Sequence, residues 1–175
     1  MIDQRDPCSS PSPPWRRGLA CAAVLVAALL YCVVAAAGDK PLEARLQHLD
    51  GGKVKLSELR GSPMLLELWA TWCLPCAEQK RIVEELREVF AERGIEVYAL
   101  NVGEDPDVVQ PFLEERPSAY PVLLDRLQVI ATRLGIAELP SLILLRADGT
   151  VAGTTLGLVE SEKLLSLLDK LDATD

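Results

Sequence analysis

Two cysteines separated by a leucine and a proline constrain this chain more than any other feature. Cys73 and Cys76 follow an apolar run at residues 64–70 and precede a long amphipathic segment, which predicts a strand, a turn and then a helix. At the start of a helix, unpaired backbone N–H groups and the helix dipole stabilise a thiolate, so Cys73 gains nucleophilic character. Cys76 lies one helical turn further on, close enough to form a disulfide with Cys73. The pattern predicts a dithiol/disulfide switch.

Two other interpretations of the cysteine pair stay open at this point. A structural zinc site needs four ligands, so the pair would supply only half of one. The sequence has no second Cys-x-x-Cys motif, and His48 is its single histidine. The two cysteines could also be buried and inert. The strand-then-helix context favours redox chemistry over both interpretations.

The N-terminal part of the chain differs sharply from the rest. Residues 1–14 are polar and rich in proline, which predicts disorder, and Arg16 and Arg17 follow them. Residues 19–37 carry no charge, and this run is close to the length that crosses a bilayer. The positive-inside rule then places residues 1–18 in the cytoplasm, residues 19–37 in the membrane as a signal anchor, and residues 38–175 outside the cytoplasm. Cleavage after Ala37, at a run of small residues, would instead release a secreted domain.

Composition narrows the function of the exported part. The net charge is −8, and an acidic surface argues against binding to nucleic acid and against docking on anionic lipid. Three of the five cysteines precede residue 38, so the globular part holds only Cys73 and Cys76. A framework of structural disulfides cannot be built from one pair, which leaves that pair available for chemistry.

Hydrophobic periodicity predicts strands alternating with helices over the exported part. The expected strands lie at residues 45–49, 53–56, 64–70, 95–102, 120–124, 141–145 and 151–156, and the expected helices at residues 57–61, 74–93, 107–116, 127–134 and 160–171. The first two strands flank an Asp-Gly-Gly turn, which predicts an N-terminal β-hairpin. The order describes an α/β fold with a mixed central sheet and helices on both faces.

Four stretches of the exported part match the pattern of one family. They are residues 49–61, residues 69–76 with the Trp-Cys-Leu-Pro-Cys motif, residues 135–141 with Leu-Pro-Ser, and residues 147–150 with Ala-Asp-Gly-Thr. On these stretches, residues 42–172 resemble thioredoxin-fold proteins of the TlpA/ResA type, the membrane-tethered thiol-disulfide oxidoreductases of bacterial envelopes. The resemblance implies a thioredoxin-like fold behind one transmembrane helix.

The resemblance also implies roles for individual residues. Cys73 would be the attacking thiolate, and Cys76 would resolve the mixed disulfide. Pro140 would be a cis-proline beside the disulfide, a conformation that costs little for proline, although an ordinary trans proline at the start of a strand is the alternative. Leu139 and Trp72 would contact the substrate with Pro140. Thiol–disulfide exchange of this kind needs no metal or organic cofactor.

Glu67 is the third candidate for catalysis. Side chains alternate along a strand, so Glu67 shares a face with Leu65 and Trp69 in the middle of an apolar run. It matches the buried acid of thioredoxins proper, which would accept the proton of Cys76. The alternative is a strand near the edge of the sheet, where Glu67 reaches water and pairs with a lysine. Gln79 stands where the family often carries a glutamate, and Arg81 where it often carries a proline.

The sequence therefore predicts an envelope thiol-disulfide oxidoreductase that reduces disulfides in exported proteins, anchored in the inner membrane with its domain in the periplasm. The family commonly receives electrons from a membrane thiol reductase. The client stays open between apocytochrome c, in cytochrome c biogenesis, a misoxidised envelope protein, the thiols of a copper protein and a general pool of disulfides. A disulfide-forming oxidant and a copper chaperone that binds through Cys73 and Cys76, with or without His48, are the alternatives. Peroxidase activity is a weaker option, because peroxidatic cysteines usually lie in a different motif.

Overall fold

The computed structural model describes residues 40–171, which fall within one compact unit, Asp39–Asp175. The predicted cytoplasmic segment at residues 1–18 and the predicted anchor at residues 19–37 lie outside the described residues. Among residues 40–171, no helix combines the length and the apolar character that crossing a membrane requires.

A mixed sheet of seven strands forms the centre of the unit, in the order β2-β1-β5-β4-β3-β6-β7. Strands β3, β4 and β5 run parallel to one another, and β1 and β6 pair antiparallel to β5 and β3. The strands are β1 (Arg45–His48), β2 (Lys53–Lys55), β3 (Met64–Trp69), β4 (Glu96–Val102), β5 (Val122–Asp125), β6 (Ser141–Leu145) and β7 (Val151–Leu156). This arrangement confirms the predicted mixed sheet.

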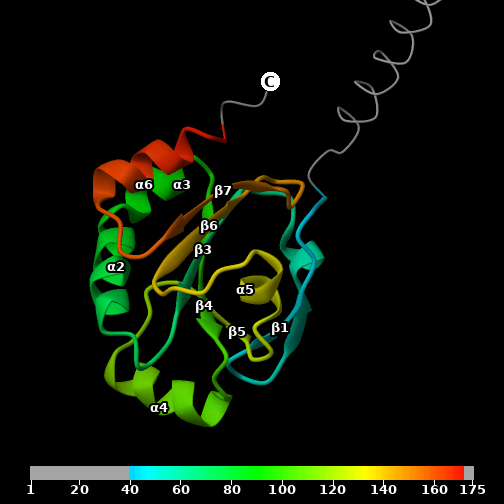
Figure 1. Cartoon of the computed structure of the whole chain (residues 1–175), viewed down its shortest axis with the longest axis vertical. Helices are drawn as coiled ribbons and strands as arrows, with labels where there is room; N and C mark the ends of the chain where they lie inside the picture. The colour runs from blue at the N-terminus through cyan, green and yellow to red at the C-terminus, as the bar shows by residue number, and fades with distance from the viewer. Residues whose placement is uncertain (1–39, 172–175) are drawn as a thin grey trace, which may run out of the picture. The chain divides into compact units, whose positions relative to one another are not determined.

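Helices cover both faces of the sheet (Figure 1). One face carries α2 (Leu74–Glu85), α3 (Arg87–Glu92), α4 (Pro106–Glu115) and α6 (Ser161–Leu168), and the other carries α5 (Val129–Arg133) and the 3-10 helix η1 (Leu56–Leu59). The hairpin of β1 and β2 extends the sheet at one edge, with Gly51 at a φ of 94° in its turn. Both the hairpin and the two-sided covering were predicted from the sequence.

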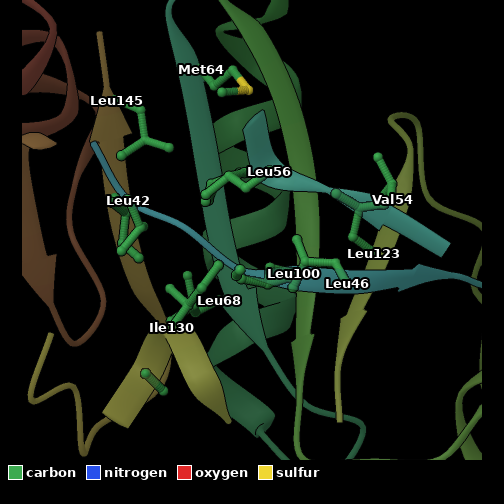
Figure 2. Packing of buried hydrophobic residues seen from close by; sticks show 14 residues of the cluster. Leu42, Leu46, Val54, Leu56, Met64, Leu68, Leu100, Leu123, Ile130 and Leu145 are labelled. Carbon is green, nitrogen blue, oxygen red and sulfur yellow. The ribbon is translucent and has the colours of Figure 1, made fainter. Parts of the chain in front are cut away.

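Strand β3 lies inside the sheet, between β4 and β6, and every residue from Met64 to Trp69 is buried. Leu66 and Leu68 belong to the cluster shown in Figure 2, where they pack with η1, α5 and the hairpin. Leu65 faces the opposite cluster, which contains residues of α2, α3 and α6. Burial of each leucine contributes about 2 kcal/mol, so β3 is held on both sides.

Two local predictions were wrong. The helix expected over residues 74–93 is interrupted at Leu86, whose N–H is shared between the carbonyl groups of Ile82 and Val83 at 3.3 and 3.2 Å. Shared hydrogen bonds of this kind are common where a helix ends, and α3 begins at the next residue, Arg87. The helical turn expected over residues 57–61 is instead the 3-10 helix η1, which begins one residue earlier, and Glu58 accepts the N–H of Lys55 at 2.9 Å.

Candidate functional site

The two cysteines lie where β3 gives way to α2, as the strand-then-helix pattern predicted. Cys73 is the N-cap residue of α2, and Cys76 lies in its first turn. They are joined in a disulfide, with a Cα–Cα distance of 5.4 Å. Cys73 is 7% exposed and Cys76 4%, whereas the neighbouring Trp72 is 69% exposed and Leu74 88%. The disulfide is therefore recessed beneath an exposed apolar rim.

A cavity of about 130 Å³ lies beside the disulfide. Its apolar wall includes Trp69 and Phe112, whose ring centroids are 5.5 Å apart. Its polar groups come from β3, from α2 with its N-cap, and from the segment that follows α4. The full lining is Glu67, Trp69, Ala70, Cys73, Cys76, Ala77, Lys80, Ala99, Phe112, Leu113, Arg116 and Ser118. All three predicted catalytic residues thus meet in one cavity.

Glu67 is 1% exposed, so the predicted alternative of an edge strand with access to water is wrong. Strand β3 lies between β4 and β6, and Tyr120 donates its hydroxyl hydrogen bond to Oε2 of Glu67. Burial raises the pKa of Glu67 to about 7, while the Tyr120 hydrogen bond and the charge of Lys80 act in the opposite direction. A group with this pKa can accept or release a proton near neutral pH.

Pro140 lies beside the carboxyl end of β3, the end that leads to the cysteines. The Leu139–Pro140 peptide bond is cis, as the resemblance implied, so the trans alternative is wrong. Because β6 runs antiparallel to β3, Ser141 pairs with Leu68 and the proline comes close to the turn that carries Cys73. Leu139 packs against the cluster that contains both cysteines. Trp72 is exposed and does not line the cavity.

A hydrogen-bond network that the sequence did not reveal holds the turn before Cys73. Glu104 accepts the backbone N–H of Thr71 at 2.8 Å and its hydroxyl at 2.6 Å. The buried Asn101 donates to the same carboxylate at 2.7 Å. Polar residues at the carboxyl end of an apolar strand are the only signal for this network, and Asn101 pairs with Trp69 at that edge. The network fixes the turn without touching the disulfide.

Gln79, which stands where the family often has a glutamate, is fully buried and points away from this chemistry. Its Oε1 accepts the N–H of Val159 at 2.9 Å, and its amide nitrogen lies 3.4 Å from the carbonyl oxygen of Val159. It does not line the cavity. Gln79 therefore attaches α2 to the segment between β7 and α6, and Glu67 is the acid that faces the cysteines.

His48 does not join the thiols in a metal site. It lies on β1, paired with Leu123 of β5, and it does not line the cavity. Among residues 40–171, no group of three or more histidine, cysteine, aspartate and glutamate side chains is arranged to hold a metal ion.

The chain is similar in sequence to known proteins along most of its length. Residues 37–154 match the model of the AhpC/TSA family. The thiol-disulfide oxidoreductase ResA of Geobacillus thermodenitrificans is 29% identical over 157 residues, covering 85% of this chain and 90% of the relative. ResA of Bacillus anthracis is 32% identical over 123 residues, covering 70% and 71%.

Solved structures agree in fold. A Chlorobium tepidum protein described as a thiol:disulfide interchange protein DsbE superposes with a TM-score of 0.66 at 26% identity, covering 78% of this chain and 95% of that one. StoA from Bacillus subtilis superposes with a TM-score of 0.60 at 19% identity, covering 74% and 98%. The fold is therefore thioredoxin-like, as predicted.

The raised pKa of Glu67 predicts a dependence of stability on pH. Its usual pKa of 4.5 applies in the unfolded chain and about 7 in the folded one, so the folded protein binds the proton more tightly. Stability should be greatest below pH 4.5 with respect to this group and should fall by about 3 kcal/mol as the pH rises to 7 and beyond. Glu67→Gln should remove this component, so the variant gains stability over wild type through that window.

Urea unfolding of the oxidised protein between pH 4 and pH 8 measures this difference. The matched control is Glu88→Gln, which changes an exposed glutamate of α3 and should follow wild type within about 0.5 kcal/mol. A difference between Glu67→Gln and wild type that stays constant with pH would show that Glu67 does not titrate in this window.

Proposed function

We propose that this chain, which belongs to the AhpC/TSA family, is a reductant of disulfides in exported proteins of the cell envelope. It is a thiol-disulfide oxidoreductase, the activity for which its ResA relatives are named. The observation that carries the proposal is the Cys73–Cys76 disulfide at the N-terminus of α2, recessed beside an apolar cavity.

The proposed reaction begins with the reduced dithiol. The Cys73 thiolate attacks one sulfur of a client disulfide, forming a Cys73–client disulfide and releasing the other client sulfur as a thiolate. Cys76 then gives its proton to Glu67 and attacks Cys73, which releases the second client thiol and forms the Cys73–Cys76 disulfide. Two electrons pass to the client, and a membrane thiol reductase would return the pair to the dithiol.

Substrate contact would fall on the exposed rim of the site. Trp72 lies beside Cys73 and is largely exposed, so its ring is available to a client chain. We assign the backbone of Leu139 to the client segment, because the following Pro140 has no N–H to pair with a neighbouring strand.

The order of attack can be tested with single cysteine variants. Cys76→Ser should accumulate a mixed disulfide with a disulfide-containing peptide, because the second attack is lost while the first remains. The matched control, Cys73→Ser, should accumulate far less of it. Non-reducing gels and mass spectrometry measure both. Capture of Cu(I) by the reduced wild type without any mixed disulfide in Cys76→Ser would favour the copper chaperone instead.

The reducing direction rests on the two residues between the cysteines. Neither Leu74 nor Pro75 carries a charge or a side-chain donor that would stabilise a thiolate, so Cys73 depends on the helix N-terminus alone. A less stabilised thiolate makes the dithiol a better reductant. We expect a potential nearer thioredoxin's, about −270 mV, than DsbA's, about −120 mV. Equilibration with glutathione measures it, and a value above about −170 mV would favour the oxidant alternative.

We propose the inner membrane as the location, with residues 19–37 as the anchor and the domain in the periplasm. The support is the charge-free run behind two arginines. A C-terminal alkaline phosphatase fusion should be active, and the protein should stay with membranes after a carbonate wash. A soluble species that begins at Gly38 would show cleavage after Ala37 and overturn the anchor while leaving export intact.

A further inference from the structure

We propose that Tyr120 is a positioning residue for thiol–disulfide exchange: its hydroxyl group holds Glu67 so that the second carboxyl oxygen stays available to Cys76. The inference rests on the proposed role of Glu67 as proton acceptor. Tyr120 lies in the segment between α4 and β5, far from the cysteines in sequence, and it does not line the cavity. It would therefore act only through Glu67.

The register of the sheet explains how Tyr120 reaches Glu67. Glu67 on β3 pairs with Ala99 on β4, and Ala99 pairs in turn with Val122 on β5. The Ala99 N–H also donates to the carbonyl oxygen of Pro121 at 2.9 Å, which fixes the chain next to Tyr120. Because Ala99 has only a methyl group, the Tyr120 side chain can pass over β4 to the Glu67 carboxyl group. The ring packs partly buried between two hydrophobic clusters, which limits its movement.

The two carboxyl oxygens of Glu67 differ in their contacts. Oε2 of Glu67 accepts the Tyr120 hydrogen bond, whereas Oε1 is buried and has no hydrogen-bond partner among the described residues. Glu67 lines the cavity together with Cys73 and Cys76. A carboxylate anchored at one oxygen presents the other in a fixed direction, which favours proton transfer from a thiol within the cavity.

Several other charged or titratable groups surround Glu67. Helix α2 contributes Lys80 and Glu84, and Arg116 follows α4; the two sheet neighbours, Ala99 and Leu142, are apolar. The Lys80 ammonium group donates to the carbonyl oxygen of Pro117 at 2.7 Å and lies 3.9 Å from Glu84. Cys73 and Cys76 titrate only when reduced.

Loss of the Tyr120 hydroxyl group would remove one contribution to the pKa of Glu67 and leave burial and the nearby charges unchanged. A hydrogen bond to a carboxylate favours its ionised form, so the bond from Tyr120 lowers the pKa of Glu67 against the effect of burial. Burial and the neighbouring carboxylate raise the pKa of Tyr120, so its hydroxyl stays protonated and remains a donor. Without it, Glu67 would be protonated over more of the neutral range.

Tyr120→Phe tests this, because phenylalanine keeps the packed ring and removes only the hydroxyl group. We expect the ¹³C carboxyl titration of Glu67, assigned with Glu67→Gln, to move about one pH unit towards alkaline pH. The rate of the resolving step, in which Cys76 attacks Cys73, should rise with pH through the titration of Glu67. This rise should move by the same amount, which slows the step about fivefold at pH 7. The initial attack by Cys73 should stay at the wild-type rate.

Tyr98→Phe is the matched control, since the partly buried Tyr98 donates a hydrogen bond to the exposed Glu96 at 2.8 Å, both on β4 and neither lining the cavity. It should leave both the titration and the rates unchanged. In a Glu67→Gln background, Tyr120→Phe should produce no further change in the pH profile. The proposal is overturned if the Glu67 titration does not move in Tyr120→Phe, or if the pH dependence of the resolving rate does not move. If wild type lacks exchange activity, the proposed function fails, while the NMR titration still decides whether Tyr120 controls Glu67.

Discussion

The desolvation of one carboxyl group on a strand buried on both faces is the constraint on which this molecule depends. Every other residue of β3 is apolar, and leucines on alternate faces hold the strand between two layers. Placing Glu67 there costs several kcal/mol, which the surrounding hydrophobic burial offsets. The same cost raises the pKa of Glu67 towards neutrality, so the packing that stabilises the sheet also sets the pH range in which this carboxyl group titrates.

The other residues of the site lie at one end of the central strands. Parallel strands β3 and β4 end there, and antiparallel β6 begins there. The chain after β3 carries Cys73, the chain after β4 carries Glu104, and the chain before β6 carries Pro140. Topology thus brings together groups that are distant in sequence, and the Glu104 network then fixes the turn that precedes Cys73.

The accuracy of prediction from sequence followed the range of the interactions involved. Hydrophobic periodicity located the strands, the hairpin and the helix that begins at Leu74, because these depend on neighbours in the chain. The cis conformation of Pro140 came from family resemblance and not from local pattern. The contacts of Thr71 with Glu104 and of Tyr120 with Glu67 span 33 and 53 residues, and no local pattern reports them. The interruption at Leu86 also left the apolar pattern of its helix unchanged.

The small side chain of Ala99 has a consequence for how the site could change. Ala99 makes no polar side-chain contact, yet it lies between the strand that carries the acid and the segment that carries the tyrosine, and it also lines the cavity. Each added methyl group at this position would occupy space that both the tyrosine and the cavity use. The Tyr120–Glu67 hydrogen bond and the volume of the cavity therefore both depend on a residue with no charge, and a larger side chain at position 99 would alter the two together.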